Sequence, residues 1–303
     1  MSAIGRLLNW QMRRLRSFVL QPRRVIQTRA VAVEDTDYCD RPIFILGVHR
    51  SGTSLVRRMF NSHPKIACPP ESFFMAHYAD MLEDGRVELG YMGLGYDFEQ
   101  MRQDLARNAA RLHEAYRIAQ GKEVWADKTP RYLDKIDAID RLFGARPVYV
   151  LVLRHPCDIL FSLHKRGWRF NDIEDPFLSS VAYVKDAIEK LLAFEQRHPE
   201  RCARLVYQRL VRAPEAELRG CLERVGFDYD PEMLNFGSKS HNFGIEDSIV
   251  RGLSSIRPME RAWESWDDRQ KEIASQAFGP RIFEEDYWAE PDRAAHARLE
   301  SRT

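Results

Sequence analysis

Short apolar runs that alternate with helical patterns dominate this chain. Five runs have the length and residue types of buried strands, namely residues 43–46, 65–68, 123–126, 148–153 and 204–207. Most are followed by apolar positions at helical spacing or by a proline that suits a first helical turn. This alternation predicts one α/β domain with a central parallel sheet flanked by helices.

Residues 72–122 interrupt the alternation. They have a mostly helical pattern with an aromatic and glycine-rich patch, so we interpret them as a largely helical insertion. Ligands of a parallel sheet bind at the carboxyl ends of its strands. Four charged residues come just after predicted strands: Arg50, Glu71, Lys128 and Arg154. We therefore expect these four side chains at one edge of the sheet.

The segment after the first strand has the spacing of a phosphate-binding loop. Gly47 and Gly52 fit G-x-x-x-x-G, but Thr53 stands where an ATP-binding loop has lysine, and Ser54 follows it. Glycines let the backbone approach a phosphate, and a helix N-terminus offers free N–H groups. Arg50 is the only strong charge inside the loop. The pattern predicts a P-loop-like anion site without the usual cation for a terminal phosphate, and a plain strand-to-helix turn is the alternative.

A second candidate anion site follows the clearest strand, 148–153. Arg154 closes that strand, and Ser162 lies eight residues later, about two turns into the next predicted helix. The pair could bind an anion between the strand end and the helix face. The alternative is that Arg154 pairs with a neighbouring acid while Ser162 is a small packing residue.

Two motifs resemble those of the sulfotransferases that use 3′-phosphoadenosine 5′-phosphosulfate (PAPS). GVHRSGTSL resembles the loop for the 5′-phosphosulfate, and LVLRHPCDILFS resembles the motif for the 3′-phosphate. HPKIACPPESFF, WADKTPRYL and LVYQRLVRAPEAELRGCLERVGFDYD resemble connecting segments of bacterial members and of the tyrosylprotein and glycan branch. The resemblance spans about residues 41–235. It implies transfer of the sulfuryl group of PAPS to a hydroxyl, or less typically an amine, by in-line displacement.

The resemblance also implies residue roles in binding the nucleotide. The 5′ end would be bound by Arg50, Ser51, Gly52, Thr53 and Ser54. The 3′-phosphate, which distinguishes PAPS from ATP, would be bound by Arg154 and Ser162. Tyr207 either contacts the nucleotide, as its counterpart does in relatives, or is a core residue. The segment SIVRGLSSIRP at 248–258 is the candidate for closing over the nucleotide.

The same resemblance supplies candidate catalytic residues. Glu71, in the context PPES, matches the position of a glutamate base, while Lys128 and Arg50 match cations that stabilise charge on the leaving oxygen. His77 is a reserve base. His49 occupies a loop position where the family more often has proline, and we do not expect it to be the base. The alternatives are a surface or helix-capping carboxylate at 71 and a solvated lysine at 128.

The acceptor is less defined than the nucleotide. Aromatic residues of the insertion, together with Trp168 and Phe170, suggest a pocket with flat apolar walls. Such walls fit a sugar ring, a tyrosyl peptide, a lipid headgroup or a small phenol equally well. The basic N-terminus tilts the expectation slightly toward a membrane-associated glycan or lipid.

Charge is unevenly distributed along the 303 residues, whose formal net charge is +1. The first 30 residues contain seven arginines and no Asp or Glu, and their apolar positions fall near one helical face. We expect residues 1–21 to form a helix that contacts an anionic membrane surface or a partner, with a solvated extension as the alternative. The predicted division is an N-terminal extension at 1–38, the catalytic domain at 39–290 and a polar tail at 291–303.

Composition excludes several other classes of protein. The near-neutral balance does not suggest nucleic-acid binding, and no apolar run is long enough to cross a bilayer. The five widely spaced cysteines form no C-x-x-C pair, so they indicate reduced thiols without a disulfide framework or a metal site. We expect a cytoplasmic protein, peripheral to a membrane if the N-terminal helix binds one. The oligomeric state stays open.

Two rival functions remain at this point. The first is an ATP-dependent P-loop kinase or NTPase, which the missing lysine disfavours, as does Arg154 where a metal-binding aspartate would be expected; Asp127 is the only weak substitute. The second is a nonenzymatic nucleotide-binding protein at a membrane, in which the basic N-terminus would be the functional part. Glu71 and Lys128 have no role in that second alternative.

Overall fold

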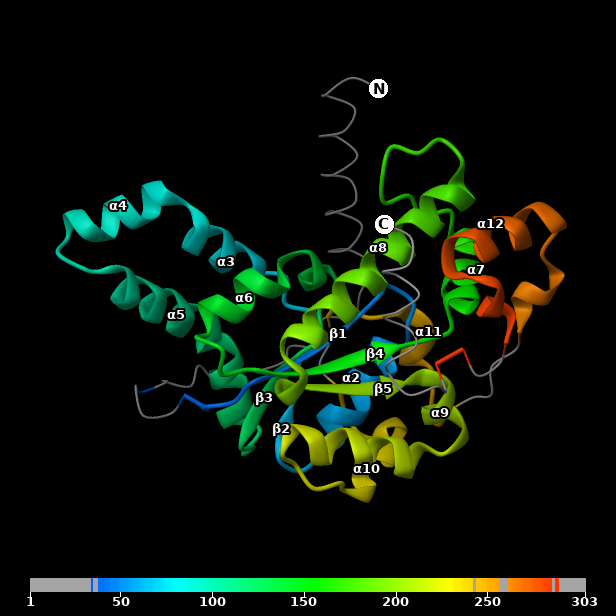
Figure 1. Ribbon diagram of the computed structural model, residues 1–303. Coiled ribbons are helices and arrows are strands. Elements are labelled where there is room, and N and C mark those ends of the chain that lie inside the picture. Colours follow the sequence, from blue (N-terminus) through cyan, green and yellow to red (C-terminus); the bar gives the residue numbers. More distant parts are fainter. Residues whose placement is uncertain (1–33, 35–37, 242–243, 257–260, 285–286, 289–303) are drawn as a thin grey trace, which may run out of the picture. The chain divides into compact units, whose positions relative to one another are not determined.

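A parallel five-stranded sheet forms the centre of the computed structural model (Figure 1). The structure describes residues 34, 38–241, 244–256, 261–284 and 287–288. The strand order is β2-β3-β1-β4-β5. The strands are β1 (Ile43–Gly47), β2 (Ile66–Ala67), β3 (Val124–Asp127), β4 (Val148–Leu153) and β5 (Cys202–Val206). The predicted fold class, a single α/β domain with a parallel sheet, is confirmed.

Helices connect the strands and extend the domain at its C-terminal side. The α-helices are α2 (Thr53–Ser62), α3 (Met75–Glu83), α4 (Gly85–Gly93), α5 (Phe98–Ala119), α6 (Ile136–Leu142), α7 (Pro156–Arg166), α8 (Pro176–Arg197), α9 (Tyr207–Arg212), α10 (Pro214–Val225), α11 (Ser248–Arg251) and α12 (Asp268–Phe278). The 3₁₀ helices are η1 (Pro130–Lys135), η2 (Pro199–Arg201), η3 (Pro231–Ser238), η4 (Ala262–Ser265) and η5 (Pro280–Phe283).

The predicted strand boundaries agree with the structure to within one or two residues at most ends. The run 148–153 is β4 without any change, whereas β5 begins two residues before the prediction. The prediction placed Tyr207 at the end of the fifth strand, but Tyr207 is the first residue of α9. An aromatic side chain continues an apolar pattern without revealing where the backbone turns helical, which explains this error.

Each face of the sheet has its own apolar core. Along β1, Phe44 and Leu46 point to one face while Ile43 and Ile45 point to the other, as strand geometry requires. The core around Phe44 includes side chains from α5, α6 and α8, and the core around Ile43 includes side chains from α2 and α10. Figure 1 shows these two layers of helices on opposite faces of the sheet. Burial on both faces explains why the strands are continuously apolar.

The sequence-predicted insertion at 72–122 consists of α3, α4 and α5. Helix α5 begins with a capping box in which Asp97 and Gln100 bond each other's backbone N–H groups. One stripe of α5 is buried in the core, whereas α4 has no buried residue and extends away from the sheet (Figure 1). The insertion therefore reaches outward from the edge of the domain that carries β2 and β3.

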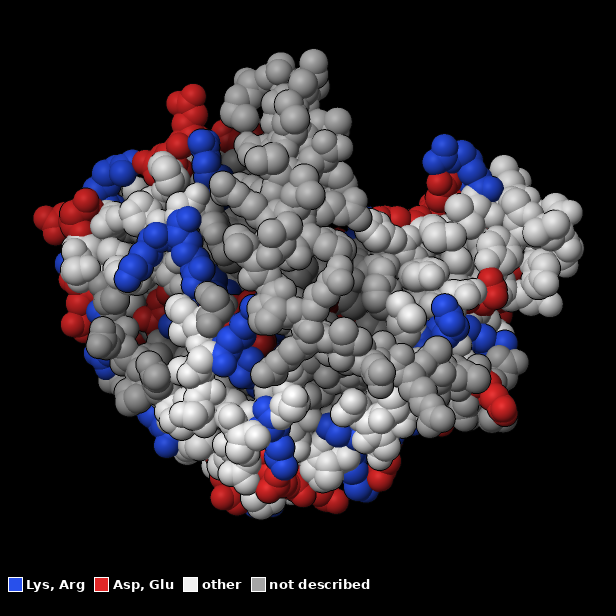
Figure 2. All heavy atoms as spheres, turned by 180° about the vertical axis from the view of Figure 1, so that it is seen from behind, with Lys and Arg blue, Asp and Glu red and all other residues white. Residues whose placement is uncertain are grey.

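The predicted extension at 1–38, apart from two of its residues, and the predicted tail at 291–303 lie outside the described residues. The division of the chain into these parts therefore stays a prediction. None of the described helices is both long and apolar enough to cross a membrane. On the face of the molecule shown in Figure 2, basic and acidic side chains are both distributed over the described surface.

Candidate active site

The loop after β1 has the backbone of an anion-binding turn. Arg50 and Gly52 adopt φ angles of 74° and 98°, and the Ser51 N–H donates to the Val48 carbonyl at 3.0 Å. A Cβ at position 52 would lie 2.3 Å from the ring of Tyr207, so this close approach requires glycine. The first N–H groups of α2, beginning at Thr53, have no acceptor within the helix. The loop therefore leads directly into a helix N-terminus that can bind an anion.

Lys128, Glu71 and Ser54 meet beside this loop. Lys128 is completely buried, its Nζ lies 3.3 Å from Ser54 Oγ, and it forms an ion pair with Glu71. The three residues come from the end of β3, the segment after β2 and the start of α2. An ammonium group has three donors, so Ser54 and Glu71 leave one N–H of Lys128 for a further acceptor. The structure thus brings a cation and a carboxylate together at the helix N-terminus.

A hydrogen-bond network fixes the segment that carries Glu71 to the end of β3. Ser72 Oγ donates to Asp127 Oδ2 at 2.5 Å, and the Ser72 N–H donates to Thr129 Oγ1 at 3.2 Å. Thr129 Oγ1 in turn donates to Asp127 Oδ1 at 2.9 Å, and Tyr132 OH lies 2.6 Å from Ser72 Oγ. Both carboxylate oxygens of Asp127 accept hydrogen bonds in this network. Asp127 is the residue that a kinase would need for metal binding.

The second candidate anion site lies against the same loop. Arg50 Nε donates to Ser162 Oγ at 2.9 Å, and a terminal nitrogen of Arg154 donates to the Arg50 carbonyl at 2.8 Å. The guanidinium of Arg154 lies over the ring of Tyr207, 4.9 Å from its centroid. The structure therefore brings Arg154, Ser162 and Tyr207 together. Arg50 connects them, because its side chain donates to Ser162 and its carbonyl accepts from Arg154. No hydrogen bond or ion pair joins the Arg50 side chain to Lys128 or Glu71 within the described residues.

Asp247 is a member of this site that the sequence analysis missed. Its carboxylate forms an ion pair with Arg50 and lies 3.6 Å from a terminal nitrogen of Arg166. Burial lowers the pKa of Arg50, and the charge of Asp247 opposes that effect. Asp247 is also the N-cap of α11, where it accepts a hydrogen bond from the Ile249 N–H. An Asp directly before SIVR is a capping signal, although it does not reveal the pairing with Arg50.

The residue before it, Glu246, attaches the same segment to α2. It forms ion pairs with Arg57, which is fully buried, and with Arg58. Burial favours a higher pKa for Glu246, but the hydrogen bond from Arg58 and the charge of Arg57 lower its pKa. The segment 248–258, which was the candidate for closing over the nucleotide, is therefore directly preceded by two acids that pair with the loop and with α2.

The reserve base His77 lies away from these clusters. It is an exposed residue of α3, and no hydrogen bond or ion pair connects its side chain with Glu71 or Lys128 in the described chain. Of the two residues that the sequence offered as bases, Glu71 contacts Lys128 in the described chain and His77 does not.

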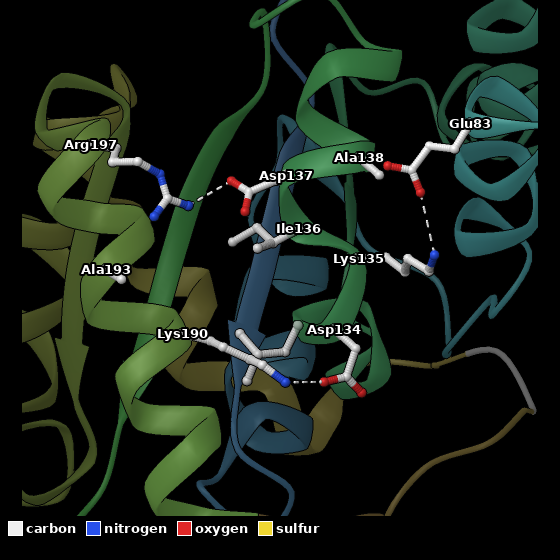
Figure 3. Close-up of a pocket in the computed structure, with 10 residues that line it drawn as sticks. Glu83, Asp134, Lys135, Ile136, Asp137, Ala138, Lys190, Ala193 and Arg197 are labelled. Atoms are coloured by element: carbon white, nitrogen blue, oxygen red, sulfur yellow. Dashed lines mark hydrogen bonds and ion pairs between the residues drawn. The ribbon is translucent and has the colours of Figure 1, made fainter.

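A cavity of about 270 Å³ lies between η1, α6 and α8. Figure 3 shows the residues that line it. Its charged walls are already paired, with Arg197 bonded to Asp137 at 2.6 Å and Lys190 bonded to Asp134 at 2.9 Å. None of the sequence-predicted site residues lines it. We interpret it as a surface depression between ion pairs.

A larger cavity of about 710 Å³ opens beside the loop at His49. Trp168 and Phe170, the residues predicted to form an aromatic acceptor pocket, both line it. Tyr183 of α8 lines it as well and contacts His49, which the sequence pattern did not reveal.

The comparison with known families now decides between the alternatives. The model of the sulfotransferase family matches residues 42–231, which include the loop, Glu71, Lys128 and the second anion site. This chain belongs to the sulfotransferase family. The match covers more than half of the chain and therefore sets the kinase and NTPase alternative aside.

Individual sulfotransferase-related proteins are more distant. The chain is 28% identical over 242 residues to the nodulation protein NoeE of Sinorhizobium fredii, covering 70% of this chain but 54% of NoeE. It is 23% identical over 201 residues to a putative protein-tyrosine sulfotransferase of Caenorhabditis briggsae, covering 64% of this chain and 68% of that protein. The chain thus spans about half the length of NoeE, and these names do not identify its acceptor.

Solved structures of sulfotransferase domains share the fold. The domain from the Synechococcus olefin synthase matches with a TM-score of 0.57 at 20% identity, covering 81% of this chain and 98% of that domain. The domain from the curacin biosynthetic pathway matches with a TM-score of 0.55 at 20% identity, covering 78% of this chain and 96% of that domain. At this identity the likeness supports the fold of the sulfotransferase family.

Proposed function

We propose that this protein transfers the sulfuryl group of PAPS to a hydroxyl acceptor, with Glu71 as the general base. The observation that carries the proposal is the meeting of Glu71, Lys128 and Ser54 at the N-terminus of α2. A base and a cation fixed at one point are what an in-line displacement between two oxygens needs. Family membership supports the reaction class.

The residues around the loop fit an anionic nucleotide. Ser51 Oγ and Arg154 Nε are buried and have no hydrogen-bond partner within the described residues, although Arg154 Nε also forms an ion pair with Asp158 Oδ2 at 4.0 Å. Buried polar atoms are normally hydrogen bonded, so these two atoms suit a ligand rich in acceptor oxygens. We assign the 5′ end to residues 51–54 with Arg50, and the 3′-phosphate to Arg154 and Ser162. Tyr207, which lies against both Gly52 and Arg154, would border the nucleotide.

When bound, PAPS supplies the sulfuryl group: the acceptor oxygen forms a bond to sulfur, the bond from sulfur to the bridging phosphate oxygen breaks, and that oxygen keeps the electron pair. Glu71 accepts the proton of the acceptor hydroxyl. Lys128 directs its remaining N–H toward the developing negative charge, while Ser54 and Glu71 fix its position. Because Lys128 is buried, its charge is less screened than a surface lysine would be.

Replacement of Glu71 tests this assignment most specifically. We expect Glu71→Gln to lower single-turnover sulfuryl transfer from radiolabelled PAPS by about 10²- to 10⁴-fold, because a glutamine cannot accept the proton. Affinity for adenosine 3′,5′-bisphosphate (PAP), measured by calorimetry, should stay within about twofold of wild type. His77→Gln is the matched control and should retain both properties. Equal loss of transfer and of PAP affinity in Glu71→Gln would refute Glu71 as the base.

The chemical class of the acceptor and the location of the protein in the cell belong to the same proposal. Small molecules, glycans, lipids and peptides all carry hydroxyl groups that Glu71 could deprotonate. We also propose that residues 1–21 bind an anionic membrane surface, which would make the enzyme peripheral to a membrane and would accommodate a lipid or glycan acceptor. Sedimentation of the full chain with vesicles that contain phosphatidylserine tests this contact, and equal sedimentation with neutral vesicles would contradict it.

A further inference from the structure

The cavity beside His49 has a flat aromatic wall, formed by Phe170 and Tyr183. Their rings are stacked with centroids 3.8 Å apart and an interplanar angle of 9°. Both residues line the cavity, and the ring of Phe170 also lies 5.6 Å from that of His49. A flat group packs well against stacked rings. The aromatic wall therefore suits a ligand with a ring.

The cavity lies beside the proposed reaction centre. It is lined by His49, which directly precedes Arg50, and by residues of η1, which begins two residues after Lys128. Burial lowers the pKa of His49 to about 4, and the positive charges of Lys128 and Arg131 add to that effect. These charges therefore reach the end of the cavity that His49 forms. A molecule bound here would lie close to the loop and to Lys128.

Two arginines of the lining have no ionic partner. Arg131 and Arg169 both line the cavity, and neither forms an ion pair within the described residues. A terminal nitrogen of Arg169 donates to the Ile173 carbonyl at 2.7 Å, and the side chain of Arg131 donates no hydrogen bond in the same part of the chain. A guanidinium group has five N–H donors, so both arginines have donors left for a ligand.

The carboxylates of the lining are already paired. Asp134 and Asp186 both form ion pairs with Lys190, at 2.9 Å and 2.7 Å. Arg131 and Arg169 come in addition to this lysine, so three cations face two carboxylates around the cavity. Arginine binds carboxylates and other oxyanions through two parallel hydrogen bonds. The lining therefore favours a ligand with a negative charge.

We propose that the acceptor is an anionic molecule with a hydroxyl group, whose ring packs against the aromatic wall and whose carboxylate or other oxyanion binds Arg131 and Arg169. Both arginines are exposed, so we expect them to select among acceptors moderately and in a salt-dependent way. They are separate from the residues that we assign to the nucleotide. The inference rests on the proposed function, since it names the substrate class of the same site.

A series of probes that differ in one group tests the preference for charge. The probes are para-nitrophenyl β-D-glucuronide, the matching glucoside and the matching 6-amino-6-deoxyglucoside, which are negative, uncharged and positive. Calorimetry on the full chain with saturating PAP measures their affinities. We expect the glucuronide to bind about tenfold more tightly than the glucoside, and the amino sugar to bind most weakly. This preference should shrink at high salt. Equal affinity for the three probes, or no binding of the glucuronide, would overturn the proposal.

Substitution of the two arginines tests which residues cause the preference. The double variant Arg131→Gln with Arg169→Gln should bind the glucuronide about tenfold more weakly and the glucoside within about twofold of wild type. The double variant Arg131→Glu with Arg169→Glu should reverse the order, so that the amino sugar binds most tightly. Arg219→Gln is the matched control, since Arg219 is an exposed residue of α10 on the other face of the sheet. A preference for the glucuronide that persists in the glutamine double variant would overturn the role of the arginines.

These measurements separate the inference from the proposed function. The glucuronide titration is repeated without PAP, so its result does not depend on the nucleotide. Absence of PAP binding in wild type would refute the proposed nucleotide site, whereas the charge preference and its loss in the glutamine double variant report on the cavity. PAP affinity in that variant should stay within about twofold of wild type. A parallel loss of PAP affinity would show that the two arginines bind the nucleotide and would overturn their role in binding the acceptor.

Discussion

The carboxylate of Asp247 pairs with the guanidinium of Arg50, although 197 residues separate the two in the sequence. Arg50 lies in the loop after β1, and Asp247 directly precedes the segment 248–258 that was the candidate for closing over the nucleotide. Arg166 lies near the same carboxylate. An acidic side chain therefore lies against two arginines of the proposed nucleotide site, and we expect a nucleotide to compete with Asp247.

Removal of that charge should strengthen nucleotide binding. We expect Asp247→Asn to bind PAP a few-fold more tightly than wild type, because Arg50 and Arg166 no longer have an internal anion. Calorimetry at two salt concentrations measures the effect, which should shrink at the higher one. Glu246→Gln is the neighbouring control, since Glu246 contacts buried Arg57 and should affect stability more than PAP affinity. Weaker PAP binding in Asp247→Asn would show that Asp247 positions Arg50 for the ligand instead.

Arg154 should decide whether the site recognises a 3′-phosphate. Its guanidinium contacts the Arg50 carbonyl and the ring of Tyr207, and its Nε lies 4.0 Å from Asp158 Oδ2 without a hydrogen bond. We predict that wild type prefers PAP to adenosine 5′-monophosphate by about tenfold to a hundredfold, because a hydrogen bond to a charged group contributes about 1.5–3 kcal/mol. Arg154→Ala should bind both ligands about equally. A preference retained in Arg154→Ala would show that another residue binds the 3′-phosphate.

The low pKa of His49 should make stability depend on pH. Unfolded His49 titrates near 6.5 and the folded residue near 4, so the unfolded chain binds more protons between these values. The contribution of neutral His49 to the free energy of unfolding is therefore complete above pH 6.5 and is lost as the pH falls toward 4. His49→Gln should reduce this loss by up to about 3 kcal/mol, measured by urea unfolding at several pH values. Identical pH dependence in wild type and variant would contradict the burial of a neutral imidazole.

Local patterns were sufficient to predict most of the fold. The apolar run of β4 has both its boundaries visible in the sequence, because a strand buried on both faces differs sharply from its polar neighbours. The loop from Gly47 to Gly52 was visible because its backbone geometry requires glycine at a fixed spacing. Glu71 and Lys128 were expected at one sheet edge because parallel strands end there, and the structure places them in contact.

Contacts between distant loops were not predictable in the same way. The pairing of Asp247 with Arg50 and that of Tyr183 with His49 join segments 197 and 134 residues apart. No periodicity relates such residues, since their contact depends on how separate helices and loops pack. His49 accordingly looked like a departure from the family pattern, whereas in the structure it contacts Tyr183 of α8.

Thermal unfolding with different nucleotides tests the central claim most directly. The claim is that the loop and Arg154 form a site for PAPS, so PAP should stabilise the chain, by about 2.7 kcal/mol at 100 times its dissociation constant. ADP, and ATP with magnesium, should stabilise it far less at the same concentration, because they lack the 3′-phosphate. Stabilisation by ATP with magnesium and none by PAP would contradict the account and would point to phosphoryl transfer.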